Sequence, residues 1–308
     1  MKQILILIAT VLLPINVLSQ NNIDETLKTY FTKYLHGEST GDISGQLLKF
    51  DGEKVFKAVE HCTVDSSANK RYAAYKLVNY LGHHFTAPEL QSETVKLLIT
   101  GCNDKDAGIV RSNLNSLATF DAKIFTAEMK YILSEMAKKP HTHYQMVIKI
   151  CGWLQTTDLI YNFRQMIADQ KINIRDRWTM RVAMARMGEA DMIDYILQKV
   201  KGSKVNDDIV YEIIPDLVYT RQKALFDYML ECIESDEKNC GASNPDSHVK
   251  VVCGYRIMEM IAPYIENFPV KIKASGDIDT KDYDKALLDV RNWIKQNRET
   301  YGIKKEGF

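Results

Sequence analysis

Residues 174–197 read IRDRWTMRVAMARMGEADMIDYIL, and this stretch decides the fold class. An alanine-rich segment ends near Gly188, where a helix C-terminus is expected, and a second apolar segment follows at once. In that second segment the apolar residues recur at helical spacing, on Met192, Ile193, Ile196, Leu197 and Val200. The stretch therefore predicts a helical hairpin in which each helix buries a broad apolar stripe.

The same apolar rhythm returns along the rest of the chain. It starts again at Ala73, Ile209 and Leu225, whereas strand signal is nearly absent. The second helix of each pair is expected to begin 33–41 residues after the previous one, near the following positions: Asn69, Asp106, His141, Ile174, Asp207 and His248. A repeat of this length predicts an all-α superhelix, a solenoid of stacked helical hairpins. Pro215 and Pro263 fall inside periodic segments, where a kink or break is expected.

Residues 174–197 resemble a HEAT repeat of the phycobilisome-lyase type. The shared pattern is an arginine-led, alanine-rich helix, then a glycine followed by an acidic residue and a second apolar helix. The matching positions are Arg175, Ala183, Ala185, Gly188 and Asp191. The resemblance is specific in this unit and diffuse over 65–265. It implies an armadillo-like superhelical fold, and its motif concerns packing rather than chemistry. A lyase-like or chaperone role is implied by the resemblance alone.

The two ends of the chain differ from the repeats. Residues 1–19 have a basic start, an apolar run and small residues at the end, so they predict a cleaved secretory signal peptide. Residues 20–64 are expected to form N-terminal capping helices, 65–266 the solenoid, and 267–308 a connector and a C-terminal capping helix. The last residues, 304–308, are expected to be frayed. No later segment is apolar enough to span a membrane. We therefore expect an extracytoplasmic protein, periplasmic if its source is a Gram-negative bacterium.

Composition and charge remove several classes of function. Among 308 residues, 40 Lys+Arg balance 40 Asp+Glu, so there is no bulk charge to attract nucleic acid or an anionic membrane. A hydrophobic content of 45% is that of a folded globular protein. The expected partner is therefore a protein or peptide, with no nucleic acid involved.

Six cysteines are too few for a disulfide scaffold in a chain of this length. Three of them cluster around a polar stretch, where Cys240 is expected to pair with Cys232 or with Cys253. Such a bridge would stabilise the fold by about 2–3 kcal/mol. No Cys-x-x-Cys occurs, so neither a redox motif nor a cysteine-based zinc site is indicated.

Residue patterns that carry chemistry are weak in this chain. His141 and His143 could supply two metal ligands, but a zinc site needs three or four, so no metal and no cofactor is expected. No nucleophile elbow and no phosphate-binding loop occurs. The strongest catalytic candidate is the pair Asp208 and Glu212, which share a helix face and could do acid–base work on glycosides. Asp207 is expected to be the N-cap of that helix.

The exposed sides of the second helices are the favoured functional surface, because solenoids line such helices up along one concave ridge. Arginine, tyrosine and tryptophan dominate binding hot spots, which indicates the following candidate set: Arg111, Asn115, Tyr144, Arg177, Trp178, Arg181, Asp208, Tyr211 and Arg256. We therefore expect a non-catalytic scaffold that binds a protein or peptide through this ridge. The alternative is a helical-scaffold enzyme that acts on a carbohydrate or cell-envelope polymer through Asp208 and Glu212.

Overall fold

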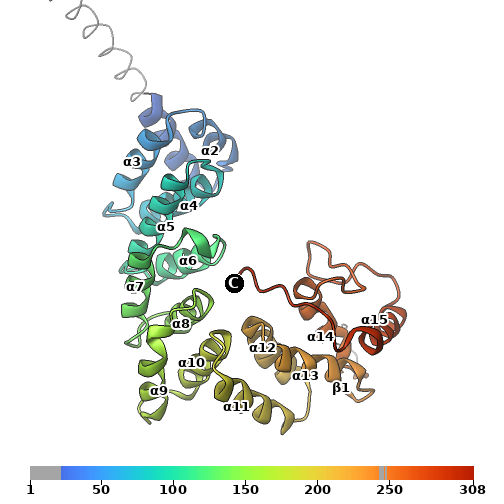
Figure 1. Cartoon of the computed structure of the whole chain (residues 1–308). Helices are drawn as coiled ribbons and strands as arrows, with labels where there is room; N and C mark the ends of the chain where they lie inside the picture. Colours follow the sequence, from blue (N-terminus) through green and yellow to red (C-terminus); the bar gives the residue numbers. More distant parts are fainter. Residues whose placement is uncertain (1–21, 243–245, 247) are drawn as a thin grey trace, which may run out of the picture. The chain divides into compact units, whose positions relative to one another are not determined.

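The structure is a computed structural model that describes residues 22–242, 246 and 248–308. The predicted signal peptide, residues 1–19, lies outside the described residues. The chain divides into two compact units, unit 1 ending at Ile150 and unit 2 beginning at Cys151. Apart from one small two-stranded sheet, the regular structure of the described residues is helical (Figure 1), so the predicted all-α, solenoid-like fold is confirmed. Among these residues, no helix combines the length and the apolar character needed to cross a membrane.

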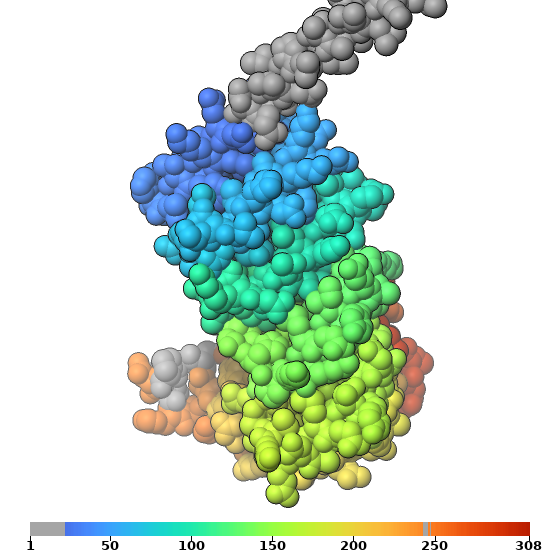
Figure 2. Space-filling model, turned by 90° about the vertical axis from the view of Figure 1, so that its left-hand side faces the viewer, coloured from blue at the N-terminus to red at the C-terminus, as the bar shows by residue number. Residues whose placement is uncertain are grey.

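Unit 1 is a stack of helical pairs. Its elements are a helical segment over 22–35, α2 (Gly41–Leu47), α3 (Gly52–Cys62), α4 (Ala68–His84), α5 (Pro88–Gly101), α6 (Ala107–Leu117), α7 (Ala127–Met136) and most of α8 (Tyr144–Trp153). Helices α3, α4 and α5 each pack against the next helix or the one after it, as stacked hairpins require. Figure 2 shows unit 1 as successive bands of colour in chain order, from blue through cyan to green.

Short polar side chains cap two of the predicted second helices. The carboxylate of Asp106 accepts hydrogen bonds from the main-chain N–H groups of Gly108 and Ile109 at 2.8 and 3.1 Å. Asn173 accepts from the N–H of Asp176 at 2.8 Å in the same way. These bonds satisfy N–H groups that have no partner within the helix. The starts of α4, α6, α8 and α10 (Ile174–Arg186) lie within three residues of their predicted positions.

Unit 2 continues the helical pairs and adds a hairpin. Its elements after the end of α8 are α9 (Ile160–Ala168), α10 (Ile174–Arg186), α11 (Ala190–Lys201), a π-helical turn (Ile209–Ile213), α12 (Ile214–Thr220), α13 (Lys223–Glu234), β1 (Lys238–Gly241), β2 (Lys250–Val252), α14 (Gly254–Ile261) and α15 (Tyr283–Asn297). Helix α10 packs against α9, α11 and α12, and α12 against α13 and α14. Pro215 opens α12 directly after the π-helical turn, and Pro263 lies in a 3₁₀ turn after α14. The predicted breaks at both prolines are therefore confirmed.

A β-hairpin lies at the position where the sequence predicts the start of a helix. The last second helix was expected near His248, and this prediction is wrong by six residues because α14 begins at Gly254. The preceding residues form the antiparallel pair of β1 and β2 instead. Only four and three residues long, these strands give too short an alternation to stand out in the sequence.

The final residues lie against unit 2, so the prediction that 304–308 are frayed is wrong. We call residues 303–308 the tail. Ile303 forms a β-bridge with Ile265, and the N–H of Lys304 donates to the carbonyl oxygen of Tyr264 at 2.8 Å. Figure 1 shows the tail in red, running from the end of α15 toward α12. Long-range contacts of this kind leave no local signal in the sequence.

Candidate functional site

A polar groove lies between α4 and α6 in unit 1. It has a volume of about 460 Å³ and is lined by Tyr72, Lys76, Asn79, Gly108, Arg111, Ser112, Asn115, Ser116 and Thr119. Two of the predicted binding residues, Arg111 and Asn115, are therefore in it. They lie four residues apart on one face of α6, and Tyr72, Lys76 and Asn79 share a face of α4 at helical spacing. We call this feature the α4–α6 groove.

The charge of the α4–α6 groove is positive. Lys76 and Arg111 are exposed, and no carboxylate is among the lining side chains to offset them. The side-chain oxygen of Asn79 is buried and accepts no hydrogen bond from any described residue. The exposed amide of Asn115 offers both donors and acceptors, which suits it to pair with a polypeptide main chain. The groove can thus bind a ligand that presents carboxylates and peptide groups together.

Tyr144 is not part of an exposed surface, so its prediction as a ridge residue is wrong. The side chain is 4% exposed, and its hydroxyl donates to the carbonyl oxygen of Ala137 at 2.6 Å. Tyr144 therefore fixes the loop that leads into α8 rather than contacting a partner. A tyrosine at the start of a helix can be buried or can contact a partner, and the helical periodicity of the sequence does not distinguish the two roles.

The predicted ridge residues of α10 are half-buried and contact other parts of unit 2. The indole N–H of Trp178 donates to the carboxylate of Asp216 at 2.7 Å and so ties α10 to α12. The guanidinium of Arg181 lies 4.5 Å from the ring centre of Tyr195, and it also donates to the carbonyl oxygen of Arg177. These contacts stabilise helix packing. They leave Trp178 and Arg181 less available to a partner than the exposed residues of the α4–α6 groove.

The remaining ridge residues belong to α14 and to the region of the π-helical turn. Arg256 donates to the carboxylate of Glu259 at 3.1 Å, and Glu259 also accepts the hydroxyl of Tyr283 at 2.8 Å. Tyr211 is 54% exposed on the π-helical turn, next to the exposed Asp208. Arg256 therefore belongs to a local polar network between α14 and α15.

The catalytic candidates Asp208 and Glu212 are both exposed, Asp208 directly before the π-helical turn and Glu212 within it. No three His, Cys, Asp or Glu side chains of the described residues gather as metal ligands. Asp207 is not the N-cap, because the N–H of Ile209 donates to the side chain of Asn206 at 3.1 Å. That prediction is wrong by one residue.

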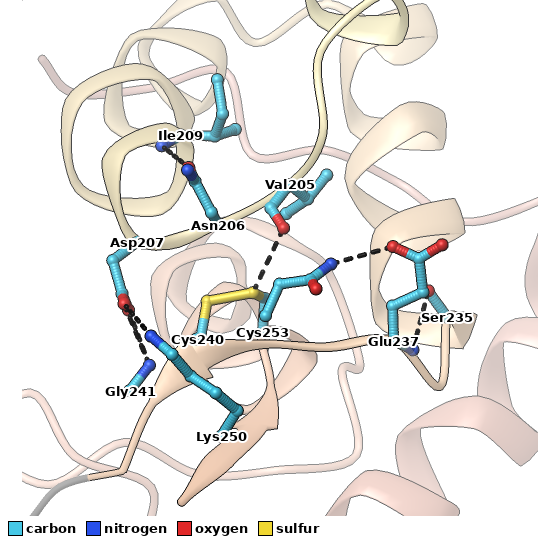
Figure 3. Close-up of a disulfide and its surroundings, with 11 residues drawn as sticks. Val205, Asn206, Asp207, Ile209, Ser235, Glu237, Cys240, Gly241, Lys250 and Cys253 are labelled. Atoms are coloured by element: carbon cyan, nitrogen blue, oxygen red, sulfur yellow. Dashed lines mark hydrogen bonds and ion pairs between the residues drawn. A yellow bond between two sulfur atoms is a disulfide. The ribbon is translucent and has the colours of Figure 1, made fainter. Parts of the chain in front are cut away.

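Asp207 instead joins the helical part of unit 2 to the hairpin (Figure 3). Its carboxylate accepts the N–H of Gly241 at 3.0 and 3.1 Å, and the ammonium group of Lys250 lies 3.7 Å away. Cys240 is bonded to Cys253, one of the two partners that the sequence left open. The other, Cys232, is a buried free thiol. The disulfide thus fixes β1 to the start of α14.

A second hollow of about 640 Å³ lies beside this disulfide. Its lining includes Lys201 and Lys204 together with Glu231 and Glu237. The ammonium of Lys201 lies 3.6 Å from the carboxylate of Glu231, so opposite charges meet inside the hollow. It therefore offers a partner less unpaired charge than the α4–α6 groove does.

Comparison of the chain with family models, with curated proteins and with solved structures gives no match. The resemblance to HEAT repeats accordingly stays a prediction.

Proposed function

We propose that this protein is a non-catalytic scaffold that binds an acidic, extended polypeptide in the α4–α6 groove. One observation carries the proposal. Two neighbouring second helices place Lys76 and Arg111 on the same groove, with no carboxylate in its lining. Charged groups left without a partner at a surface favour a ligand of opposite charge.

The amide side chains add the second element of recognition. Asn79 and Asn115 come from the two walls of the groove. The exposed amide of Asn115 can donate to a carbonyl oxygen and accept from an N–H, whereas the side-chain oxygen of Asn79 is buried. An extended peptide presents both groups along its length, whereas a folded surface offers few of them. Carboxylate side chains on that peptide would pair with Lys76 and Arg111.

We further propose that the protein works outside the cytoplasm, in the periplasm if its source is a Gram-negative bacterium. The sequence of residues 1–19 supports this location. So does the disulfide between Cys240 and Cys253, because such bonds persist mainly in oxidising compartments.

The test is site-specific photo-crosslinking in the native compartment. A photoreactive phenylalanine analogue replaces Asn115 in the groove or, as the control, Tyr131, which is 62% exposed on α7. Crosslinked products are identified by mass spectrometry. We expect one dominant polypeptide from position 115 that is absent from position 131. The same products from both positions would contradict a partner held in the groove.

Charge reversal then tests the chemistry of binding. Lys76→Glu with Arg111→Glu should abolish crosslinking from position 115. Lys96→Glu with Lys123→Glu makes the same change of charge at exposed positions elsewhere in unit 1 and should leave crosslinking intact. Circular dichroism must show that both double variants are folded. Undiminished crosslinking in the groove variant would exclude the proposed recognition of an acidic partner.

A further inference from the structure

Two arginines hold the main chain of the tail in unit 2. The guanidinium of Arg186, at the end of α10, donates to the carbonyl oxygens of Lys305 and Gly307 at 3.0 and 2.8 Å. The guanidinium of Arg221, which follows α12, donates to the main-chain oxygen of Phe308 at 3.3 Å. Carbonyl oxygens are common to every residue type, so these bonds select an extended main chain rather than a sequence.

The side chain of Phe308 supplies the selective contact. Its ring centre lies 5.8 Å from that of Trp153 and 5.6 Å from that of Tyr219, in edge-to-face arrangements. Such geometry is favourable for aromatic pairs beyond the area that they bury. The side chains of residues 304–306 are exposed. The tail is thus recognised by its main chain and by one aromatic ring.

Each of the two arginines divides its hydrogen bonds between the tail and the rest of unit 2. Arg186 also donates to the carbonyl oxygen of Tyr219 at 2.8 Å, and Arg221 donates to that of Val218. Arg186 and Arg221 are 7% and 3% exposed in the presence of the tail. Burial, followed by the nearby charge of Arg221, lowers the pKa of Arg186 to about 10. The Nε atom of Arg221 is buried without a hydrogen-bond partner in the described part of the chain. Buried cations cost free energy unless acceptors surround them, so the main-chain oxygens of the tail help to satisfy both guanidinium groups.

We propose that this surface, formed by Trp153, Arg186, Tyr219 and Arg221, is a second polypeptide-binding site. Its ligand is an extended segment of another polypeptide that carries an aromatic side chain, and the tail is a resident occupant that such a segment displaces. The site lies wholly in unit 2. It shares no residue with the α4–α6 groove, so either proposal can fail without the other.

The tail lowers the apparent affinity of the site for any external segment. A tethered ligand competes at a high effective concentration, and only the fraction of molecules with the tail released can bind. Weakening the tail should therefore strengthen binding in trans. A surface that merely packs the end of the chain would show no saturable binding in trans.

The test uses a fluorescent synthetic peptide of the tail sequence, Ile-Lys-Lys-Glu-Gly-Phe, and measures its anisotropy with the full-length chain. We expect Phe308→Ala to bind this peptide about tenfold or more tightly than the natural chain does. Leu288→Ala, at an exposed position on α15, is the matched control and should bind like the natural chain. Replacing the phenylalanine of the peptide by alanine should abolish binding. Equal affinity of Phe308→Ala and the natural chain, or of the two peptides, would overturn the proposal.

A second measurement on the natural chain does not depend on how the variant folds. Trypsin cleaves after Lys304 and Lys305 only when the tail is released. Excess of a trypsin-resistant peptide, with norleucine in place of both lysines, should accelerate cleavage of the tail, whereas the alanine-for-phenylalanine version should not. Cleavage at the same rate with and without the first peptide would show that the tail is not displaced, and the proposal would be wrong.

Discussion

The guanidinium of Arg71 forms a two-pronged ion pair with the carboxylate of Asp104, which lies one helical pair further along the chain. Both N···O distances are 2.7 Å, and the two side chains are 6% and 8% exposed. Asp104 also accepts the N–H of Asp106, the N-cap of α6, at 2.8 Å. This pair therefore links α4 to the residue that starts α6, and both helices line the α4–α6 groove.

Replacing Asp104 by Asn should destabilise unit 1 strongly. The change leaves the buried charge of Arg71 without its counter-ion, which costs about 3–5 kcal/mol for pairs of this kind. Glu135→Gln removes an exposed ion pair with Lys138 on the same unit and should cost less than about 1 kcal/mol. Urea denaturation followed by circular dichroism measures both variants. Similar losses in the two would show that the buried pair contributes no more than a surface one.

The contribution of the pair should also depend on pH. The hydrogen bonds from Arg71 hold the pKa of Asp104 below its usual range. A group whose pKa is lower in the folded state stabilises that state above its unfolded pKa, which is about 3.9 for Asp. This stability is lost as the pH falls below that value. The difference in unfolding free energy between the natural chain and Asp104→Asn should therefore be constant near neutrality and shrink in acid. A difference that grows in acid would contradict the assignment.

Gly152 should not tolerate a side chain. A Cβ atom there would lie 2.4 Å from the hydroxyl oxygen of Tyr219 and 2.9 Å from the backbone of Ala183, and the backbone cannot easily move. We expect Gly152→Ala to cost about 1–3 kcal/mol of unfolding free energy. Gly41→Ala meets no atom within 4 Å and should change stability by less than about 1 kcal/mol. Thermal denaturation compares the stabilities of the two variants. An unchanged melting temperature for Gly152→Ala would show that Tyr219 moves aside at little cost.

Loss of the disulfide should destabilise unit 2 through its unfolded state. Cys240 and Cys253 are 13 positions apart, so opening the bridge frees a short loop and costs about 2–3 kcal/mol in the chain-entropy account. The double variant Cys240→Ser, Cys253→Ser should show this loss in urea denaturation. A reducing agent should weaken the natural chain and Cys62→Ser alike, and it should not affect the double variant. A double variant that still responds to the reductant would place the stabilising bond elsewhere.

The fold class follows from local patterns, and the exceptions have physical causes. The stripe that begins at Ala73 and the caps at Asp106 and Asn173 act within a few residues, so their effect is visible in the sequence. Asp207 looks like an N-cap, but its carboxylate is taken by Gly241 of the hairpin, 34 positions away. Asn206 next to it has the same capping ability and assumes the role.

The candidate site could be predicted in part. Arg111 and Asn115 are polar residues on the open side of a second helix, and that pattern is enough to find them. Lys76 and Asn79 carry the same signal, since they alternate with the apolar stripe of α4, and a search of every second helix for such spacing would have included them. Nothing local marks Arg186 as a ligand of the tail, because its partners lie 119 and 121 positions further on.

Those two bonds change how unit 2 responds to force or heat. A stack in which each helical pair touches only its neighbours can unravel from one end, pair after pair. In unit 2, the last residues are hydrogen-bonded to α10 and to the residue after α12. A force applied to these residues is therefore transmitted at once to helices near the beginning and the middle of the unit. The tail thus connects the end of unit 2 to α10 and to the residue after α12. The helices that it joins should therefore unfold in one cooperative step.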